Sequence, residues 1–385
     1  MGALSDTHYR FPWREGNRFE LLVDGERFFP AMLHAIRLAE QHILLEIYLF
    51  ESGDVAERFI DALLVAAGRG VAVYLLLDDF GARKLSTRDR QRLRNGGIRL
   101  SFYNPLRYGA LRRNLFRDHR KLLVVDGRIA FTGGAGITDS FDTRGRPYGW
   151  HEVMLRIAGP CVADWQQLFE QTWNNWVSPP LALPSPPITD YSGSCPGRVV
   201  LNAPSRMEIK RTLVKHIRNA EQRVWLATAY FIPSWKIRRL LRRAAHHGVD
   251  VRLLLPGPYT DHPAVRHAGR RFYSGLLRNG VRIYEYQPRF LHAKMLLCDD
   301  WLSVGSSNID RWNLRWNLEA NQELADESLA MEIQRLFERD FADSHEIHYG
   351  TWFSRPWQRR LQEWFWGKVD LWLERRSQRR KGEQD

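Results

Sequence analysis

Short apolar runs alternate with amphipathic stretches along the chain, and the same order occurs twice. In the first half, the apolar run 42–50 is followed by an amphipathic stretch that ends in glycine and then by the run 71–77. In the second half, the runs 223–231 and 249–255 flank a similar stretch. Apolar runs of this length predict strands, and the amphipathic stretches predict helices. The alternation therefore predicts α/β units with a largely parallel sheet.

Each half continues in the same way, which predicts a duplicated domain rather than a short repeat. A further helix is expected to end at Asn95-Gly96 and at Asn279-Gly280, and the predicted strands 98–103 and 281–286 follow. A proline-rich stretch separates the copies and suits an extended connector. We expect a first domain at 1–177, this connector at 178–197, a second domain at 198–345 and a C-terminal extension at 346–385.

Both halves carry the motif H-x-K-x-x-x-x-D at the same place in the repeat. Its residues are the candidate catalytic set: His119, Lys121 and Asp126, and His292, Lys294 and Asp299. Residues two apart in a strand share a face, so each His is expected beside its Lys. Each Asp has the opposite parity and falls where a turn is predicted. A turn or packing role is therefore expected for the two Asp residues, without direct contact to substrate.

The paired motifs point to phosphodiester chemistry. A neutral imidazole is a good nucleophile near pH 7, its protonated form is a good acid, and a neighbouring lysine supplies positive charge for phosphate oxygens. If the halves pack about a pseudo-twofold axis, one pocket holds two His and two Lys. One His could then form a phosphohistidine while the other serves as acid and base, with no metal or cofactor. A lone His is usually a surface or core residue, but two copies at equivalent positions favour catalysis.

These motifs give the chain a resemblance to the phospholipase D superfamily. The second copy continues as Gly305-Ser306-Ser307-Asn308, similar to that family's extended H-x-K-x4-D-x6-G-S-x-N signature. The resemblance implies that Ser306 and Asn308 contact the phosphate of the substrate. It also implies that Glu319 orients a catalytic His, with Glu152 as its first-half counterpart; a surface strand position is the alternative for either Glu.

The first copy departs from the family pattern at one position. It reads Gly133-Gly134-Ala135-Gly136 where such motifs usually run Gly-Gly-x-Asn. The missing amide puts phosphate binding by the first half in doubt, although His119 and Lys121 are present.

Within the superfamily, the chain is most similar to bacterial cardiolipin synthases, particularly the B-type without transmembrane helices. The similarity runs from Trp13 to about residue 325 and includes 128–134, 229–231 and 304–308. It implies two tandem phospholipase D-like α/β/α domains related by pseudo-twofold symmetry. It also implies transfer of a phosphatidyl group between two phosphatidylglycerols, which gives cardiolipin and glycerol. The alternatives are a hydrolase of the phospholipase D type, a nuclease or other phosphodiesterase, and a degenerate membrane-associated scaffold.

Charge and tryptophan content favour a lipid partner. The chain has 57 Lys and Arg against 44 Asp and Glu, a net charge of +13, which predicts an anionic partner. Its 15 tryptophans suit a membrane interface, although core packing is the alternative for any one of them. An anionic phosphatidylglycerol membrane is therefore the expected partner, with no obligatory nucleic acid. The loop before His119 could grip a lipid phosphate or be solvated; its basic residues are Arg107, Arg112, Arg113 and Arg117.

The expected location is the cytoplasmic face of the bacterial inner membrane, as a peripheral protein. The three cysteines are too few and scattered for a disulfide framework. Residues 1–16 show no apolar segment typical of a secretory signal, and no uninterrupted apolar run reaches about 18 residues. Residues 352–381 mix tryptophan, leucine and arginine at helical spacing, which predicts an amphipathic interfacial helix, with packing on the domain as the alternative. The oligomeric state stays open.

Overall fold

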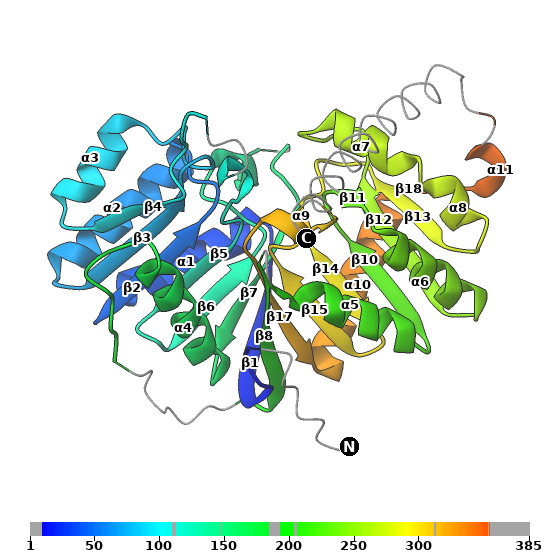
Figure 1. The fold of residues 1–385 in the computed structure, drawn as a ribbon, viewed down its shortest axis with the longest axis horizontal. Helices are drawn as coiled ribbons and strands as arrows, with labels where there is room; N and C mark the ends of the chain where they lie inside the picture. The colour runs from blue at the N-terminus through cyan, green and yellow to red at the C-terminus, as the bar shows by residue number, and fades with distance from the viewer. Residues whose placement is uncertain are drawn as a thin grey trace.

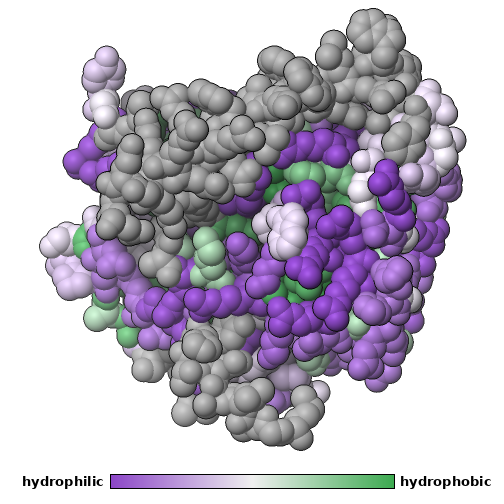
Figure 2. Space-filling model, turned by 45° about the vertical axis from the view of Figure 1, so that its right-hand side comes forward, coloured by the Kyte–Doolittle hydropathy of each residue, from purple (hydrophilic) through white to green (hydrophobic). Residues whose placement is uncertain are grey.

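The computed structural model describes residues 10–109, 113–146, 148–184, 193–203, 206–311, 313–352 and 354. They form two similar halves that lie side by side and share one long sheet (Figure 1). Of the described residues on the face in Figure 2, most are hydrophilic, and hydrophobic residues are visible in recesses between them.

The first half contains seven strands, four α-helices and two short 3-10 turns among its described residues. The strands are β1 (Arg14–Val23), β2 (His42–Ile47), β3 (Ala72–Asp78), β4 (Arg99–Tyr103), β5 (Lys121–Val125), β6 (Ile129–Gly133) and β7 (Val153–Ala158). The helical elements are α1 (Gly25–Leu38), α2 (Asp54–Gly68), α3 (Thr87–Asn95), η1 (Arg113–Leu115), η2 (Asp139–Phe141) and α4 (Cys161–Asn174).

The second half repeats this order and adds short elements. Its strands are β8 (Cys195–Ala203), β9 (Arg206–Met207), β10 (Arg223–Ala227), β11 (Phe231–Ile232), β12 (Asp250–Pro256), β13 (Arg282–Tyr286), β14 (Met295–Cys298), β15 (Trp301–Gly305), β16 (Ile309–Asp310), β17 (Glu319–Ala325) and β18 (Ser344–Ile347). Its helices are α5 (Glu208–Asn219), α6 (Trp235–His246), α7 (Pro263–Arg270), α8 (Tyr273–Leu277), α9 (Asn313–Trp316), α10 (Glu327–Ala342) and α11 (Tyr349–Trp352).

The strand order of the main sheet shows the duplication directly. It runs β18-β13-β12-β10-β14-β15-β17-β8-β1-β7-β6-β5-β2-β3-β4, with β9 paired to β8. Read outward from the central β8–β1 pair, the next six strands of each half are equivalent, as a pseudo-twofold relation requires, and the second half adds β18 at its end. The predicted α/β class with two tandem domains is therefore confirmed.

The prediction of a largely parallel sheet is wrong, because the sheet is mixed. Only the outer ladders β2–β3, β3–β4, β10–β12 and β12–β13 of the main sheet are parallel. The central ladders, including β2–β5 and β10–β14, are antiparallel. Strands β5 and β14 are buried along their whole length, so their apolar runs look like those of a parallel sheet.

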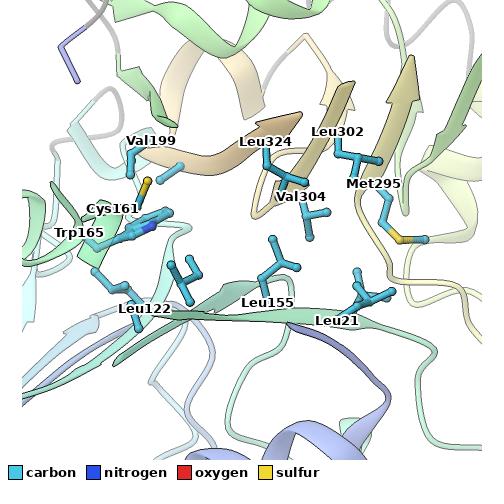
Figure 3. Packing of buried hydrophobic residues seen from close by; sticks show 14 of the residues in the cluster. Leu21, Leu122, Leu155, Cys161, Trp165, Val199, Met295, Leu302, Val304 and Leu324 are labelled. Atoms are coloured by element: carbon cyan, nitrogen blue, oxygen red, sulfur yellow. The ribbon is translucent and has the colours of Figure 1, made fainter. Parts of the chain in front are cut away.

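The two halves share one hydrophobic core, which fixes how they face each other. Leu155 of the first half points toward Val304 and Leu324 of the second (Figure 3), and Leu122 and Leu302 belong to the same cluster. The two outer faces have cores of their own, under α1 and α2 on one side and under α5 and α6 on the other. Because protein cores are closely packed, this shared layer holds the ends of β5 and β14 in a fixed relation.

Two of the predicted domain boundaries fall within strands of the structure, and the domain limits themselves stay a prediction. Strand β8 begins at Cys195, inside the predicted connector 178–197, and residues 185–192 lie outside the described part of the chain. Strand β18 crosses the predicted boundary at 345 and pairs with β13. Nearly all of the predicted helix 352–381 also lies outside the described residues. Among the described helices, none combines the length and the apolar character needed to cross a membrane.

Candidate active site

The first motif joins His119 to a glutamate of the other half. The backbone N–H of His119 donates to the carbonyl of Leu318, and the N–H of Leu318 donates to the carbonyl of Arg117, both at 2.9 Å. Leu318 immediately precedes β17, so Glu319 at the start of that strand meets the imidazole. The Nδ1 atom of His119 lies 2.9 Å from one carboxylate oxygen of Glu319 and 3.1 Å from the other.

The second motif repeats this arrangement with the halves exchanged. The backbone N–H of His151 donates to the carbonyl of Phe290 at 2.9 Å, and that of His292 donates to the carbonyl of His151 at 2.8 Å. Glu152 follows His151, and its Oε2 lies 2.5 Å from Nδ1 of His292. Each half thus supplies the carboxylate that contacts the other half's histidine, and both Nδ1 atoms are occupied. In each imidazole, Nε2 is therefore the nitrogen without a carboxylate contact among the described residues; that of His292 lies 3.2 Å from Lys294 Nζ.

Both motif lysines fold back onto the segment that carries their histidine. The ammonium of Lys121 donates to the carbonyl of His119, and that of Lys294 donates to the carbonyl of His292. Lys294 Nζ also lies 3.3 Å from Glu152 Oε2 and 2.9 Å from His292 Nδ1. The sequence-predicted His and Lys of each motif are therefore neighbours, as their spacing predicts.

Burial is the largest influence on the pKa values of the histidines, Lys121 and Glu152 at this site. It lowers the pKa of His119 and, more strongly, that of His292, where the nearby Lys294 and Lys121 also disfavour a second positive charge. Burial likewise lowers the pKa of Lys121 to about 7 and raises that of Glu152 to about 7. Neutral imidazoles are thus favoured near neutral pH, the form in which histidine is a nucleophile. A phosphate anion in the pocket would raise the pKa values of the lysines and of the imidazoles again by charge attraction, so that one histidine can carry the proton that a leaving group needs.

The remaining polar groups at the site come from the second half. The Asn308 side chain is fully buried; its Oδ1 accepts from the Thr228 hydroxyl at 3.3 Å, whereas no described residue pairs with its Nδ2. The hydroxyl of Ser306 donates to the Glu319 carboxylate. A buried amide without a partner is costly, which fits a donor kept for an anionic ligand.

The first half has no room for the corresponding side chains. A Cβ atom at Gly134, the counterpart of Ser306, would lie 2.0 Å from Glu152 Oε2. A Cβ atom at Gly136, the counterpart of Asn308, would lie 2.7 Å from the Leu49 carbonyl oxygen. The close packing of the first half therefore requires glycine at 134 and 136, where the second half has Ser306 and Asn308.

Aromatic rings surround both histidines, and sequence reasoning missed them. The ring of Tyr48 lies edge-on to His119, with centroids 4.8 Å apart. Trp150, Phe141 and Phe290 contact His292 at centroid distances of 5.1, 5.2 and 5.7 Å. The available signal was positional: Trp150 lies two residues before Glu152, and Tyr48 lies near the end of the first repeated apolar run, 42–50. These rings exclude water from the imidazoles and account for much of the burial that shifts their pKa values.

Asp126 and Asp299 lie in turns, as the sequence predicts, and their carboxylates bond to the backbone there. Both have a left-handed backbone, with φ of 53° and 51°. The Asp126 carboxylate accepts three backbone N–H bonds from residues 40–42, and that of Asp299 accepts three from residues 221–223. Each Asp thus fixes the start of the strand that pairs with its own motif strand.

We expect Asp126→Ala to destabilise the fold by about 1–3 kcal/mol, because three backbone donors lose their acceptor. Turnover per folded molecule should stay within about twofold of wild type, since the carboxylate contacts no pocket residue. Chemical denaturation and kcat measured below the melting temperature check both parts. Asp299→Ala is the matched variant in the other half, and a severe loss of kcat in either folded variant would restore a catalytic role.

The basic loop before His119 is only partly exposed. Arg117 of this loop is buried; its guanidinium lies 3.4 Å from Asp78 and donates to the Asn104 carbonyl. Neither alternative given for the loop, lipid binding or solvation, therefore holds for Arg117. Arg107 is exposed, whereas Arg112 lies outside the described residues.

In the described part of the chain, no group of three or more His, Cys, Asp or Glu has a metal-binding arrangement.

A duplicated α/β domain with a His–Lys pair from each half at the junction defines the phospholipase D superfamily. The family described as "Cardiolipin synthase, PLD-like domain" matches residues 32–173 and 213–341. Cardiolipin synthase A of Pseudomonas aeruginosa is 37% identical over 364 residues, covering 92% of this chain and 72% of that protein. Cardiolipin synthase B of Escherichia coli is 37% identical over 328 residues, covering 80% and 76%. The chain belongs to the phospholipase D-like family of cardiolipin synthases, and is an enzyme of the phosphatidyltransferase type.

Solved structures support the same fold. A phosphatidylserine synthase of Haemophilus influenzae aligns with a TM-score of 0.66 at 12% identity, over 88% of this chain and 90% of that one. A polyphosphate kinase of Porphyromonas gingivalis aligns with a TM-score of 0.59 at 16% identity, over 86% of this chain and 49% of that one. At these identities the likeness concerns the fold alone.

Proposed function

We propose that the protein makes cardiolipin and glycerol from two molecules of phosphatidylglycerol, through a phosphohistidine on His119 or His292. One observation carries the proposal: the reciprocal Nδ1 contacts, His119 to Glu319 at 2.9 Å and His292 to Glu152 at 2.5 Å, hold the histidine of each half against a carboxylate of the other. The names and similarity of the curated relatives support phosphatidylglycerol chemistry.

The first step forms the covalent intermediate. The Nε2 atom of one histidine attacks phosphorus, and the bond from phosphorus to the glycerol headgroup oxygen breaks. The other histidine, protonated, gives its proton to that oxygen and glycerol leaves. The products are a phosphatidyl-histidine and a neutral second imidazole.

The second step releases cardiolipin. The neutral imidazole removes a proton from the free primary hydroxyl of a second phosphatidylglycerol, whose oxygen attacks phosphorus. The bond from phosphorus to nitrogen breaks, and both histidines return to their starting states. Water in place of that hydroxyl gives phosphatidic acid, so acceptor access decides between transfer and hydrolysis.

Lys121, Lys294 and Asn308 hold the phosphate in this scheme. The two ammonium groups come from opposite halves and offset the charge that develops on the phosphoryl oxygens. The unpartnered Nδ2 of Asn308 donates to one of these oxygens, which satisfies a buried amide. Glu152 and Glu319 keep each imidazole in the tautomer that leaves Nε2 available. Because Gly136 supplies no amide, the first half contributes less to phosphate binding than the second.

We further propose that the enzyme works as a peripheral protein on a phosphatidylglycerol-containing membrane, at the cytoplasmic face of the bacterial inner membrane. The net charge of +13 supports an anionic surface.

Mass spectrometry of the lipids formed from phosphatidylglycerol liposomes tests the proposed reaction. We expect cardiolipin and free glycerol in equal amounts, because each transfer releases one glycerol. Phosphatidic acid alone would assign a hydrolase of the same superfamily. No lipid turnover across a range of detergent and salt would reject the synthase and favour a nucleic-acid phosphodiester as substrate.

A further inference from the structure

Exposed aromatic side chains gather at the sheet edge that carries the two histidines. Phe80 follows the carboxyl end of β3, and Tyr259 follows that of β12. Trp235 opens α6 after β10, whereas Tyr148 lies between β6 and β7. Strand β6 runs parallel to β2, since both are antiparallel to β5, so it ends at the same edge. With Tyr108, which follows β4, five of the eight exposed aromatic residues in the described chain lie here.

Basic side chains accompany these rings. The Arg239 guanidinium lies 5.2 Å from the ring centre of Trp235, and that of Arg83 lies 4.7 Å from the ring centre of Phe80. One such pair occurs in each half. Lys236, beside Trp235, is also exposed. A cation held over an exposed ring combines an apolar surface with a charge that a lipid phosphate can neutralise.

We infer that this aromatic edge, defined by Phe80, Tyr108, Tyr148, Trp235 and Tyr259, docks on an anionic lipid bilayer. Aromatic rings with polar or basic neighbours lie well at the boundary between headgroups and acyl chains. The backbone of a duplex nucleic acid would use the positive charge but would leave the exposed rings without an apolar environment. The inference rests on the proposed function and extends it: the pocket opens toward the membrane, so a lipid reaches the histidines without leaving the bilayer surface.

The double variant Trp235→Ser, Tyr259→Ser tests the edge by its binding to vesicles of phosphatidylglycerol mixed with phosphatidylcholine. These side chains are 59% and 47% exposed, so their loss should not disturb the fold. We expect vesicle partitioning to weaken at least about tenfold, because two large side chains lose their apolar contact. Turnover of a short-chain, water-dispersed phosphatidylglycerol should be unchanged.

The control is the double variant Leu38→Ser, Val65→Ser. The two replaced residues are 64% and 58% exposed. These residues lie at the ends of α1 and α2, next to the amino ends of β2 and β3, on the opposite edge. Equal partitioning of the Trp235/Tyr259 variant and wild type, or absence of wild-type binding to these vesicles, would overturn the docking surface. Wild-type binding that depends on Trp235 and Tyr259, without turnover of either lipid form, would support docking and reject the proposed reaction instead.

Discussion

His119→Ala and His292→Ala should each lower the turnover of phosphatidylglycerol by at least about a thousandfold. One histidine supplies the nucleophile and the other the acid and base, and neither role has a substitute in the pocket. Both Nδ1 atoms are engaged by glutamates, so alanine removes the only ring nitrogen that can react. Initial rates of cardiolipin formation in detergent micelles, measured for both variants, check this expectation.

The matched control is His216→Ala. His216 stacks on Trp301 with ring centroids 3.8 Å apart and lies outside the pocket, so its loss reports the general effect of removing a packed histidine. We expect this variant to keep near wild-type turnover while folded. A folded His119 or His292 variant that keeps more than about a tenth of the activity would contradict the mechanism, and unchanged function in both would favour the scaffold alternative.

His151→Gln should destabilise the protein by about 3–5 kcal/mol and lower kcat. The buried His151 ring joins the halves: Nδ1 lies 2.9 Å from Asp24, and Nε2 lies 3.2 Å from Asp340. Despite burial, these carboxylates raise its pKa to about 10, while Arg289 and a stacked Tyr286 complete its surroundings. Glutamine removes the positive charge and leaves two buried carboxylates with less compensation. Thermal and chemical denaturation measure the loss.

The contribution of His151 should depend on pH in a defined direction. Because its folded pKa is raised, the stabilisation is complete below about pH 6.5, the unfolded pKa, and is lost as pH rises toward 10. The stability gap between wild type and His151→Gln should therefore narrow across that range. The exposed His34→Gln serves as control. The His151 carbonyl also accepts the backbone N–H of His292, so kcat should fall with little change in KM. A constant gap with normal kcat would reject this positioning role.

The duplicated order of elements could be predicted because each apolar run and amphipathic stretch carries its own local periodicity. The direction in which neighbouring strands pair could not be predicted from the sequence. Leu122 to Val125 in β5 are all buried, as in a parallel strand, yet β5 is antiparallel to both neighbours. Pairing direction depends on how the chain returns between strands, which burial alone does not record.

The part of the candidate site that lies in the repeated motifs could be predicted from the sequence. His119, Lys121, His292 and Lys294 share one spacing, and the two glutamates follow from the family resemblance. The exchange of glutamates between halves was not predictable, since Glu319 lies 200 residues from His119. His151 was missed for the same reason: its partners Asp24 and Asp340 are 127 and 189 residues away. Such contacts depend on the packing of the two halves.

The most direct test of the covalent mechanism uses a phosphatidyl ester of p-nitrophenol, whose leaving group departs without protonation. Wild type, His119→Ala and His292→Ala are each mixed with this ester, and p-nitrophenolate release and intact protein mass are followed over one turnover. We expect one variant, lacking only the acid and base, to release one equivalent and gain the mass of one phosphatidyl group. The other variant, lacking the nucleophile, should do neither. An adduct in both variants, or in neither, would contradict a phosphohistidine intermediate at this site.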